Sequence, residues 1–264
     1  MVGPRVLAVD WSGALVGAQH RIRLAEATDG HLIAVTGGRG REAVVEHVAA
    51  LAARARRGGP GLVVGFDFSF GLPEWFTVAR GCGDLPAVWE LVAREGEGWL
   101  RDCPPPFWGR PGTRRPRADP ARPLFRRTEL ASPYRPSSTF QVGGAGAVGT
   151  GSLRGMPLLR RLRAAGAAVW PLDAAGPATV VEIYPRELTG AVVKSDVAAR
   201  RAYVRADGRV PAELVDDVVA TEDAFDAAFS ALAMAGHVTE LGALAAHRGV
   251  EGEVWRPVPV PAGC

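Results

Sequence analysis

Hydrophobic positions along the chain form short runs typical of strands, separated by segments whose apolar residues recur with helical spacing. Residues 5–10 form a first apolar run. Residues 20–28 and 31–38 alternate more, and the Asp-Gly pair between them is typical of a hairpin turn. Residues 41–57 place valine and leucine on one helical face, and the apolar run at 61–67 predicts a buried strand. The first quarter of the chain therefore predicts the order β-β-β-α-β.

The rest of the chain combines helical segments with one long stretch of little periodicity. Residues 103–155 are rich in proline and arginine and end in a glycine-rich turn, which predicts an insertion over the domain rather than a linker. We expect one α/β domain over residues 1–264, with a mixed five-stranded sheet flanked by helices. The strongly apolar first, fourth and fifth strands suit parallel neighbours covered on both faces. The remaining elements are predicted helices over 73–100 (in two pieces), 156–166 and 221–238, strands over 167–173 and 178–185, and mixed helix and loop over 186–219.

Composition and charge say more about the location and partners of the protein than about any reaction that it catalyses. The 264 residues have 47% hydrophobic content and a net charge of +3, which favours an acidic partner only weakly. No run reaches the ~18 apolar residues of a membrane span, and the start of the chain has no signal-peptide layout, so we expect a cytoplasmic protein. Three widely spaced cysteines, Cys82, Cys103 and Cys264, predict neither a zinc site nor a disulfide-linked partner. The oligomeric state stays open.

Three acidic residues lie at or near the carboxyl ends of the apolar strands, where a carboxylate is costly unless something compensates it. Asp10 ends "RVLAVD", Asp67 lies within "GLVVGFDFSFGLP", and Glu182 lies within "ATVVEIYP". In open α/β sheets, ligands bind beyond this edge. The sequence therefore predicts that these three side chains meet at one site.

The final predicted helix adds two acids to the same site. Asp223 and Asp226 are three positions apart in "TEDAFDAAFSALAMA", so they share a helical face, and small alanines would let this helix lie close to the sheet. Carboxylates gathered in one pocket repel each other by about 4 kcal/mol per pair at ~4 Å and an effective dielectric of ~20. Oxygen ligands without histidine or cysteine favour Mg²⁺ or Mn²⁺, and two such ions could support phosphodiester cleavage.

Five motifs spread from residue 9 to residue 235 together resemble the "domain of unknown function" family numbered 429, whose members are described as predicted nucleases of RNase H-like fold. They are "VDWSG", "GFDFSFGLP", "FQVGGAGAVGTGSLRGMP", "VVEIYPREL" and "TEDAFDAAFSALAMA". The resemblance implies the order β-β-β-α-β-α-β-α, with metal-binding carboxylates on the first strand, the fourth strand and the last helix. Asp10 and Asp67 fit the two strands, and the pair Asp223 and Asp226 is similar to the paired acids of junction resolvases. Glu182 departs from this pattern.

Each acid also has a simpler interpretation that the sequence leaves open. Asp10 could cap a turn or helix, and Asp67 could close an Asx-turn. Glu182 could form a structural salt bridge with Arg186 or another arginine, and the two helix acids could complement a helix dipole. The glycine-rich segment lacks P-loop spacing, so we expect a flexible turn at the rim of the pocket.

These observations favour a metal-dependent nuclease with Mg²⁺ or Mn²⁺ as cofactor and a nucleic acid as partner. Asp10, Asp67, Glu182 and Asp226 would bind the metal, and Asp223 would act beside them. The arginine-rich insertion would pair with phosphates, unless it is simply a solvated loop. Its interleaved aromatics would stack on bases, namely Phe107, Trp108, Phe125 and Tyr134. The alternatives are a nucleotide-handling phosphotransferase or NTPase, which the absence of a repeat disfavours, and a non-catalytic nucleic-acid-binding module. The predicted substrate-binding residues are Trp11, Ser12, Arg110, Arg114, Arg115, Arg126, Arg127, Arg186 and Lys194.

Overall fold

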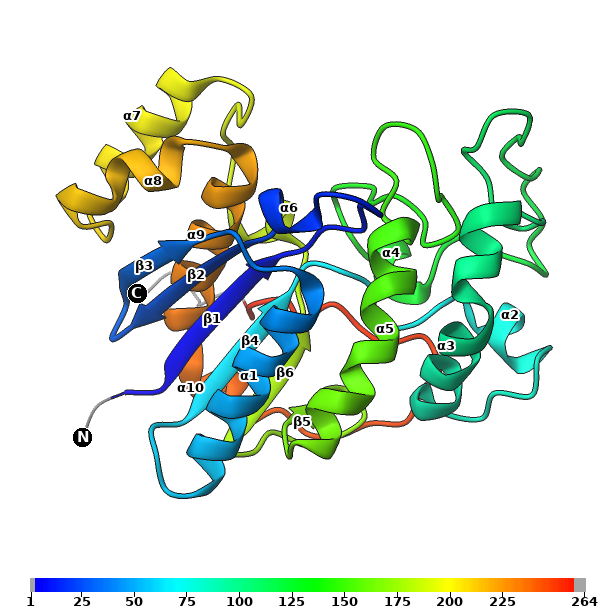
Figure 1. Ribbon diagram of the computed structural model, residues 1–264, viewed down its shortest axis with the longest axis horizontal. Helices are drawn as coiled ribbons and strands as arrows, with labels where there is room; N and C mark the ends of the chain where they lie inside the picture. The colour runs from blue at the N-terminus through cyan, green and yellow to red at the C-terminus, as the bar shows by residue number, and fades with distance from the viewer. Residues whose placement is uncertain (1–2, 259–264) are drawn as a thin grey trace, which may run out of the picture.

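A mixed six-stranded sheet forms the centre of the protein in the computed structural model, which describes residues 3–258 (Figure 1). The strands are β1 (Arg5–Asp10), β2 (Arg23–Thr28), β3 (His31–Thr36), β4 (Leu62–Phe66), β5 (Ala168–Val169) and β6 (Ala178–Glu182). Their order in the sheet is β3-β2-β1-β4-β6-β5. β1, β4, β6 and β5 are parallel, whereas β2 is antiparallel to both β1 and β3.

Helices cover both faces of the sheet. They are α1 (Arg41–Arg56), α2 (Glu74–Val78), α3 (Leu85–Asp102), α4 (Arg127–Leu130), α5 (Gly149–Ala164), α6 (Pro185–Leu188), α7 (Val197–Asp207), α8 (Val215–Val219), α9 (Glu222–Ala235) and α10 (Val238–Leu241), with 3₁₀ turns at Ala18–His20 and Ala212–Leu214. Leu7 and Val9 of β1 join the core layer under α1, α3 and α5, whereas Val6 and Ala8 join the layer under α9. This alternation buries both faces of β1, as expected for a central parallel strand.

The predicted α/β class and the helix-flanked mixed sheet are confirmed, but the number of strands is wrong, because the sheet has six rather than five. The additional strand, β5, keeps only two residues of the run predicted over 167–173. Trp170 N–H still bonds to Val180 O at 2.9 Å, and Pro171 follows on this edge strand, where sheets tolerate proline. β5 therefore remains a short edge strand.

The glycine-rich segment was predicted as a turn, but its second half is the start of α5. This helix begins at Gly149 instead of residue 156 and continues through Pro157. Glycine lowers helix propensity by about 1 kcal/mol relative to alanine, which explains the wrong prediction. Packing explains the helix, because a Cβ atom on Gly155 would lie 2.6 Å from the ring of Phe68. The glycines let α5 approach the loop that follows β4.

The predicted insertion is irregular between α3 and α5, apart from the single turn α4. It is nevertheless anchored, because Phe107 and Phe140 are buried and contact the ring of Phe76 of α2, with centroids 5.6 Å and 5.0 Å away. Trp108 is also buried. Phe107 and Trp108 therefore belong to the core, and the prediction that they stack on nucleobases is not supported by their positions.

Two further predictions concern the cysteines and membrane-spanning helices. Cys82 and Cys103 are buried free thiols, and Cys264 lies outside the described residues. Over residues 3–258, no helix combines the length and the apolar character that crossing a membrane requires.

Candidate active site

The parallel strands β1 and β4 end level with each other, and an acid lies at each end. Val9 faces Phe66, Phe66 faces Glu182, and the Asp67 N–H donates to Val9 O at 3.0 Å. This register places Asp10, Asp67 and Glu182 at one edge of the sheet, because neighbouring parallel strands run in the same direction.

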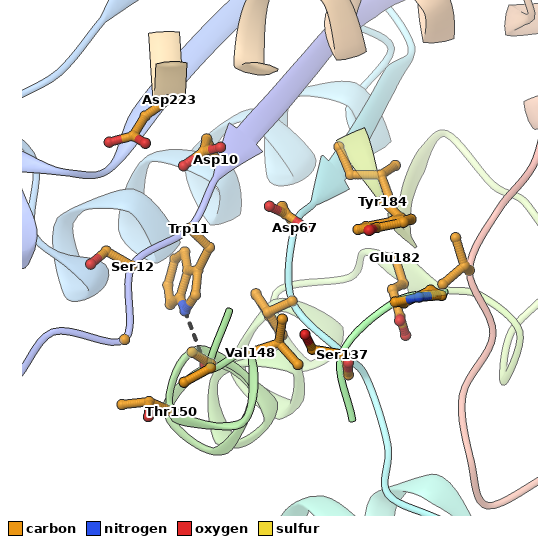
Figure 2. Close-up of a pocket in the computed structure, with 18 of the residues that line it drawn as sticks. Asp10, Trp11, Ser12, Asp67, Ser137, Val148, Thr150, Glu182, Tyr184 and Asp223 are labelled. Atoms are coloured by element: carbon orange, nitrogen blue, oxygen red, sulfur yellow. Dashed lines mark hydrogen bonds between the residues drawn. The ribbon is translucent and has the colours of Figure 1, made fainter. Parts of the chain in front are cut away.

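The first turns of α9 bring two further carboxylates to this edge. Thr221 caps the helix by accepting a backbone hydrogen bond at 3.0 Å, which fixes where the helix begins. α9 lies against β1 and β2, and Asp223 lines the same pocket as Asp10 (Figure 2). Asp226 lies further along the helix, with its Oδ1 atom 2.5 Å from the ammonium of Lys194.

Burial and mutual repulsion raise the pKa values of these acids. Burial is the largest cause for Asp10, whose pKa lies well above its ordinary value, and the charges of Asp67, Asp223 and Asp226 add to the rise. Burial also raises the pKa of Asp67 to about 8, with Asp226 contributing next. The charge of Lys194 acts in the opposite direction on both groups. Within the described chain, neither Asp10 nor Asp67 receives a hydrogen bond on its carboxylate, so both ionised forms are poorly compensated.

Glu182 lies at the same edge but is held in a buried ion-pair network. Its carboxylate accepts hydrogen bonds from Arg126 Nη1 at 2.9 Å, from Arg126 Nη2 at 2.5 Å and from the Phe70 N–H at 2.8 Å. Arg126 also pairs with Glu129, and all three charged side chains are buried. The contacts therefore favour the structural salt bridge for Glu182, with Arg126 rather than Arg186 as its partner.

A cavity of about 390 Å³ opens beside the strand ends (Figure 2). Asp10, Asp67 and Asp223 lie along one side, and the first turn of α5 lies across from them. Trp11 joins the two sides, because its indole N–H donates to Gly151 O at 3.2 Å. The other polar residues of the lining are Ser12, Arg21, Ser69, Arg126, Glu129, Ser137, Thr150, Glu182 and Tyr184.

The predicted substrate-binding residues divide into those that reach this cavity and those that do not. Trp11 and Ser12 line it, and Lys194 pairs with Asp226 beside it. Arg126 also lines it, but two glutamates already neutralise its charge. The exposed residues outside the lining are Arg110, Arg114, Arg115, Arg127 and Arg186.

Sequence reasoning missed several polar residues of the cavity. Tyr184 is half-buried, and its pKa is raised by burial and then by the charge of Asp67. It lies two residues after Glu182, so the rule that ligands bind beyond strand ends could have identified it. Arg21, Ser137 and Thr150 come from loops and a helix start, where no periodicity indicates a direction.

Whether this site can hold a divalent cation depends on how many carboxylate oxygens it offers as ligands. Within the part of the chain that the structure describes, no three His, Cys, Asp or Glu side chains form a ready-made metal-binding group. Mg²⁺, however, commonly binds through one or two carboxylates and completes its shell with waters and substrate phosphates. Asp10 and Asp67 offer two such carboxylates without competing hydrogen bonds. The residues therefore fit an ion shared with a substrate better than a closed structural metal site.

Comparison with protein-family models, with curated proteins and with solved structures finds no match for this chain. The function is therefore inferred from the site itself. Its two distinguishing features are the acids of the sheet edge with raised pKa values and the arginine-rich insertion, whose Ser137 contributes to the cavity lining.

Proposed function

We propose that this protein is a metal-dependent nuclease that hydrolyses phosphodiester bonds of a nucleic acid. The observation that carries the proposal is the pair of carboxylates, Asp10 and Asp67, at the ends of adjacent parallel strands in an open cavity, where the charge of Lys194 offsets their burial only in part. Burial raises the pKa of both groups, so the ionised pair is unfavourable without a neighbouring cation. A bound divalent cation supplies that charge and polarises a phosphoryl oxygen.

The chain's own residues would divide the work of binding and orientation. Asp10 and Asp67 would hold Mg²⁺ or Mn²⁺, Asp223 would complete the acidic side of the cavity, and Asp226 would pair with Lys194. Glu182 would hold the insertion against the sheet through Arg126, instead of binding metal. The exposed arginines of the insertion would pair with backbone phosphates and make affinity depend on salt.

The order of the elements supports an RNase H-like fold for this enzyme. The chain runs β1-β2-β3-α1-β4, and β6 and α9 follow the insertion and β5. The two proposed ligands come from the ends of the first and fourth strands, and α9 packs against β1, β2, β3 and β4. This arrangement agrees with the one that the resemblance to the family numbered 429 implies.

A Mn²⁺ titration followed by thermal melting tests the metal site. At a hundredfold excess of Mn²⁺ over its dissociation constant, we expect the wild-type chain to gain about 2.7 kcal/mol of stability. Asp10→Asn should lose this gain, because it removes one of the two proposed ligands. Asp216→Asn, which changes an exposed acid on α8, is the matched control and should keep it. A gain of equal size in Asp10→Asn would contradict the proposed site.

Cleavage assays then test the reaction. Single-stranded, duplex, hybrid and branched nucleic acids, each with Mn²⁺, should include at least one substrate that the wild type cleaves and Asp10→Asn does not. Turnover of a nucleoside triphosphate without cleavage of any nucleic acid would favour the phosphotransferase or NTPase alternative. Binding without turnover would favour a non-catalytic module.

A further inference from the structure

Lys194 is the single lysine of the chain. The sequence has 31 lysine and arginine residues, and every other one is an arginine. An ammonium is a compact point charge with three rotatable donors, whereas a guanidinium is a wide planar fork. Lys194 is therefore the one compact cationic side chain of the sequence.

The position of Lys194 is the acidic edge of the sheet. Its Nζ atom lies 2.5 Å from Asp226 Oδ1, and 11% of the lysine side chain and 18% of the aspartate side chain are exposed. The charge of Lys194 also acts on Asp10 and Asp67, whose pKa values it lowers against the effect of burial. The ammonium therefore contacts the carboxylate of Asp226 on α9, and its charge also acts on the acids at the ends of β1 and β4.

Arg200 anchors the backbone at Lys194 through a hydrogen bond. Arg200 of α7 is buried, with 3% of its surface exposed, and it donates to Lys194 O. The same guanidinium donates to Val219 O at the end of α8, at 3.1 Å from Nε and 2.7 Å from Nη2. The loop that carries Lys194 between α6 and α7 is thus tied to the segment that leads into α9. This is a built arrangement, in contrast to a solvated surface lysine.

The contact between Lys194 and Asp226 bears on how many divalent ions the site takes. Asp10, Asp67 and Asp226 carry three negative charges when ionised, which the ammonium and one divalent cation together neutralise. A second divalent ion that used Asp226 as a ligand would have to displace Lys194 from it. Asp223 lines the same cavity, and the charges of Arg23 and Arg21 lower its pKa against burial.

We infer that Lys194 is the built-in second cation of this site, so that the cavity takes one divalent ion, at Asp10 and Asp67, instead of two. The inference rests on the proposed function and narrows it. The ammonium beside Asp226 would take the place of the second ion of a two-metal phosphodiesterase. Lysine is suited to this place because it presents its charge as a point, as an ion does.

The number of Mn²⁺ ions bound per chain, measured by electron paramagnetic resonance and calorimetry on the full chain, tests the inference. We expect about one ion for the wild type and about two for Lys194→Met, in which Asp226 becomes free to bind. Asp226→Asn should still bind one ion, because Lys194 and not the metal uses this carboxylate. Arg201→Met, which removes one positive charge from the exposed side of α7, is the matched control and should bind one ion.

The outcomes separate the inference from the proposed function. Two ions in the wild type, or one in both the wild type and a folded Lys194→Met, would overturn the role of Lys194 and leave the nuclease proposal standing. No ion in the wild type would overturn both. If thermal melting shows that Lys194→Met does not fold, Asp226→Asn decides, because loss of Mn²⁺ binding in this variant would overturn the inference.

Discussion

Two groups of acids at the same edge of the sheet differ in how their charge is compensated. Glu182 of β6 accepts hydrogen bonds from Arg126 and from a backbone N–H. Asp10 and Asp67, at the ends of β1 and β4, accept none from the described residues and have raised pKa values. All three acids follow apolar strand residues, so their positions in the sequence look alike. The comparison teaches that the partner of a strand-end acid, more than its location, separates a structural role from a functional one.

The largest expected effect is the loss of stability when the arginine that neutralises Glu182 is removed. Arg126→Met should lower the free energy of unfolding by about 3–5 kcal/mol, because it leaves Glu182 and Glu129 buried without a cation. Urea unfolding measures the loss. Arg101→Met is the control, because it breaks an ion pair that is exposed to solvent and should change stability very little. Equal stability of the two variants would mean that the buried network does not hold the insertion in place.

Much of the fold could be predicted from the sequence because local patterns determine it. Apolar runs over 5–10, 61–67 and 178–185 mark the central strands, and each is buried on both faces. The helical spacing of 41–57 and 221–238 corresponds to α1 and α9. The same reasoning placed the acids at strand ends, because strand direction and the C-terminal edge follow from the order of elements.

The remaining features depend on contacts between residues far apart in the chain. Arg126 is 56 residues from Glu182 and lies in a segment without periodicity, so nothing local indicates their ion pair. The start of α5 depends on the contact of Gly155 with Phe68, which overrides a poor helix propensity. Lys194 lies in a loop, and its approach to Asp226 follows from tertiary packing alone.

The raised pKa of Asp67 should make the stability of the metal-free protein depend on pH. The pKa of Asp67 is raised to about 8, first by burial and then by Asp226, whereas an unfolded aspartate titrates near ~3.9. Between these two values the folded chain keeps a proton that the unfolded chain loses. Stability in metal-free buffer should therefore fall as pH rises from about 4 to about 8, by at most about 1.4 kcal/mol per pH unit for this group.

Thermal melting of wild type and Asp67→Asn across this pH range measures the effect. The variant should show a shallower slope, because it removes the titrating group, although Asp10 still contributes its own raised pKa. Asp216→Asn should keep the full slope, since it changes an exposed acid. Saturating Mn²⁺ should flatten the wild-type slope, because binding favours the ionised carboxylates. A slope that Asp67→Asn leaves unchanged would place the proton uptake elsewhere.

The smallest expected effect lies outside the cavity, at exposed charges that take part in no buried ion pair of the described residues. Arg114 and Arg115 are exposed on the insertion, and Arg115 also lies over the rings of Trp108 and Phe125. Changing both arginines to glutamine should leave the melting temperature nearly unchanged. It should reduce the slope of log binding constant against log salt by about one for each arginine that contacts a phosphate. The control is Arg57→Gln, an exposed change just after α1, and an equal reduction there would show that the insertion has no special part in binding nucleic acid.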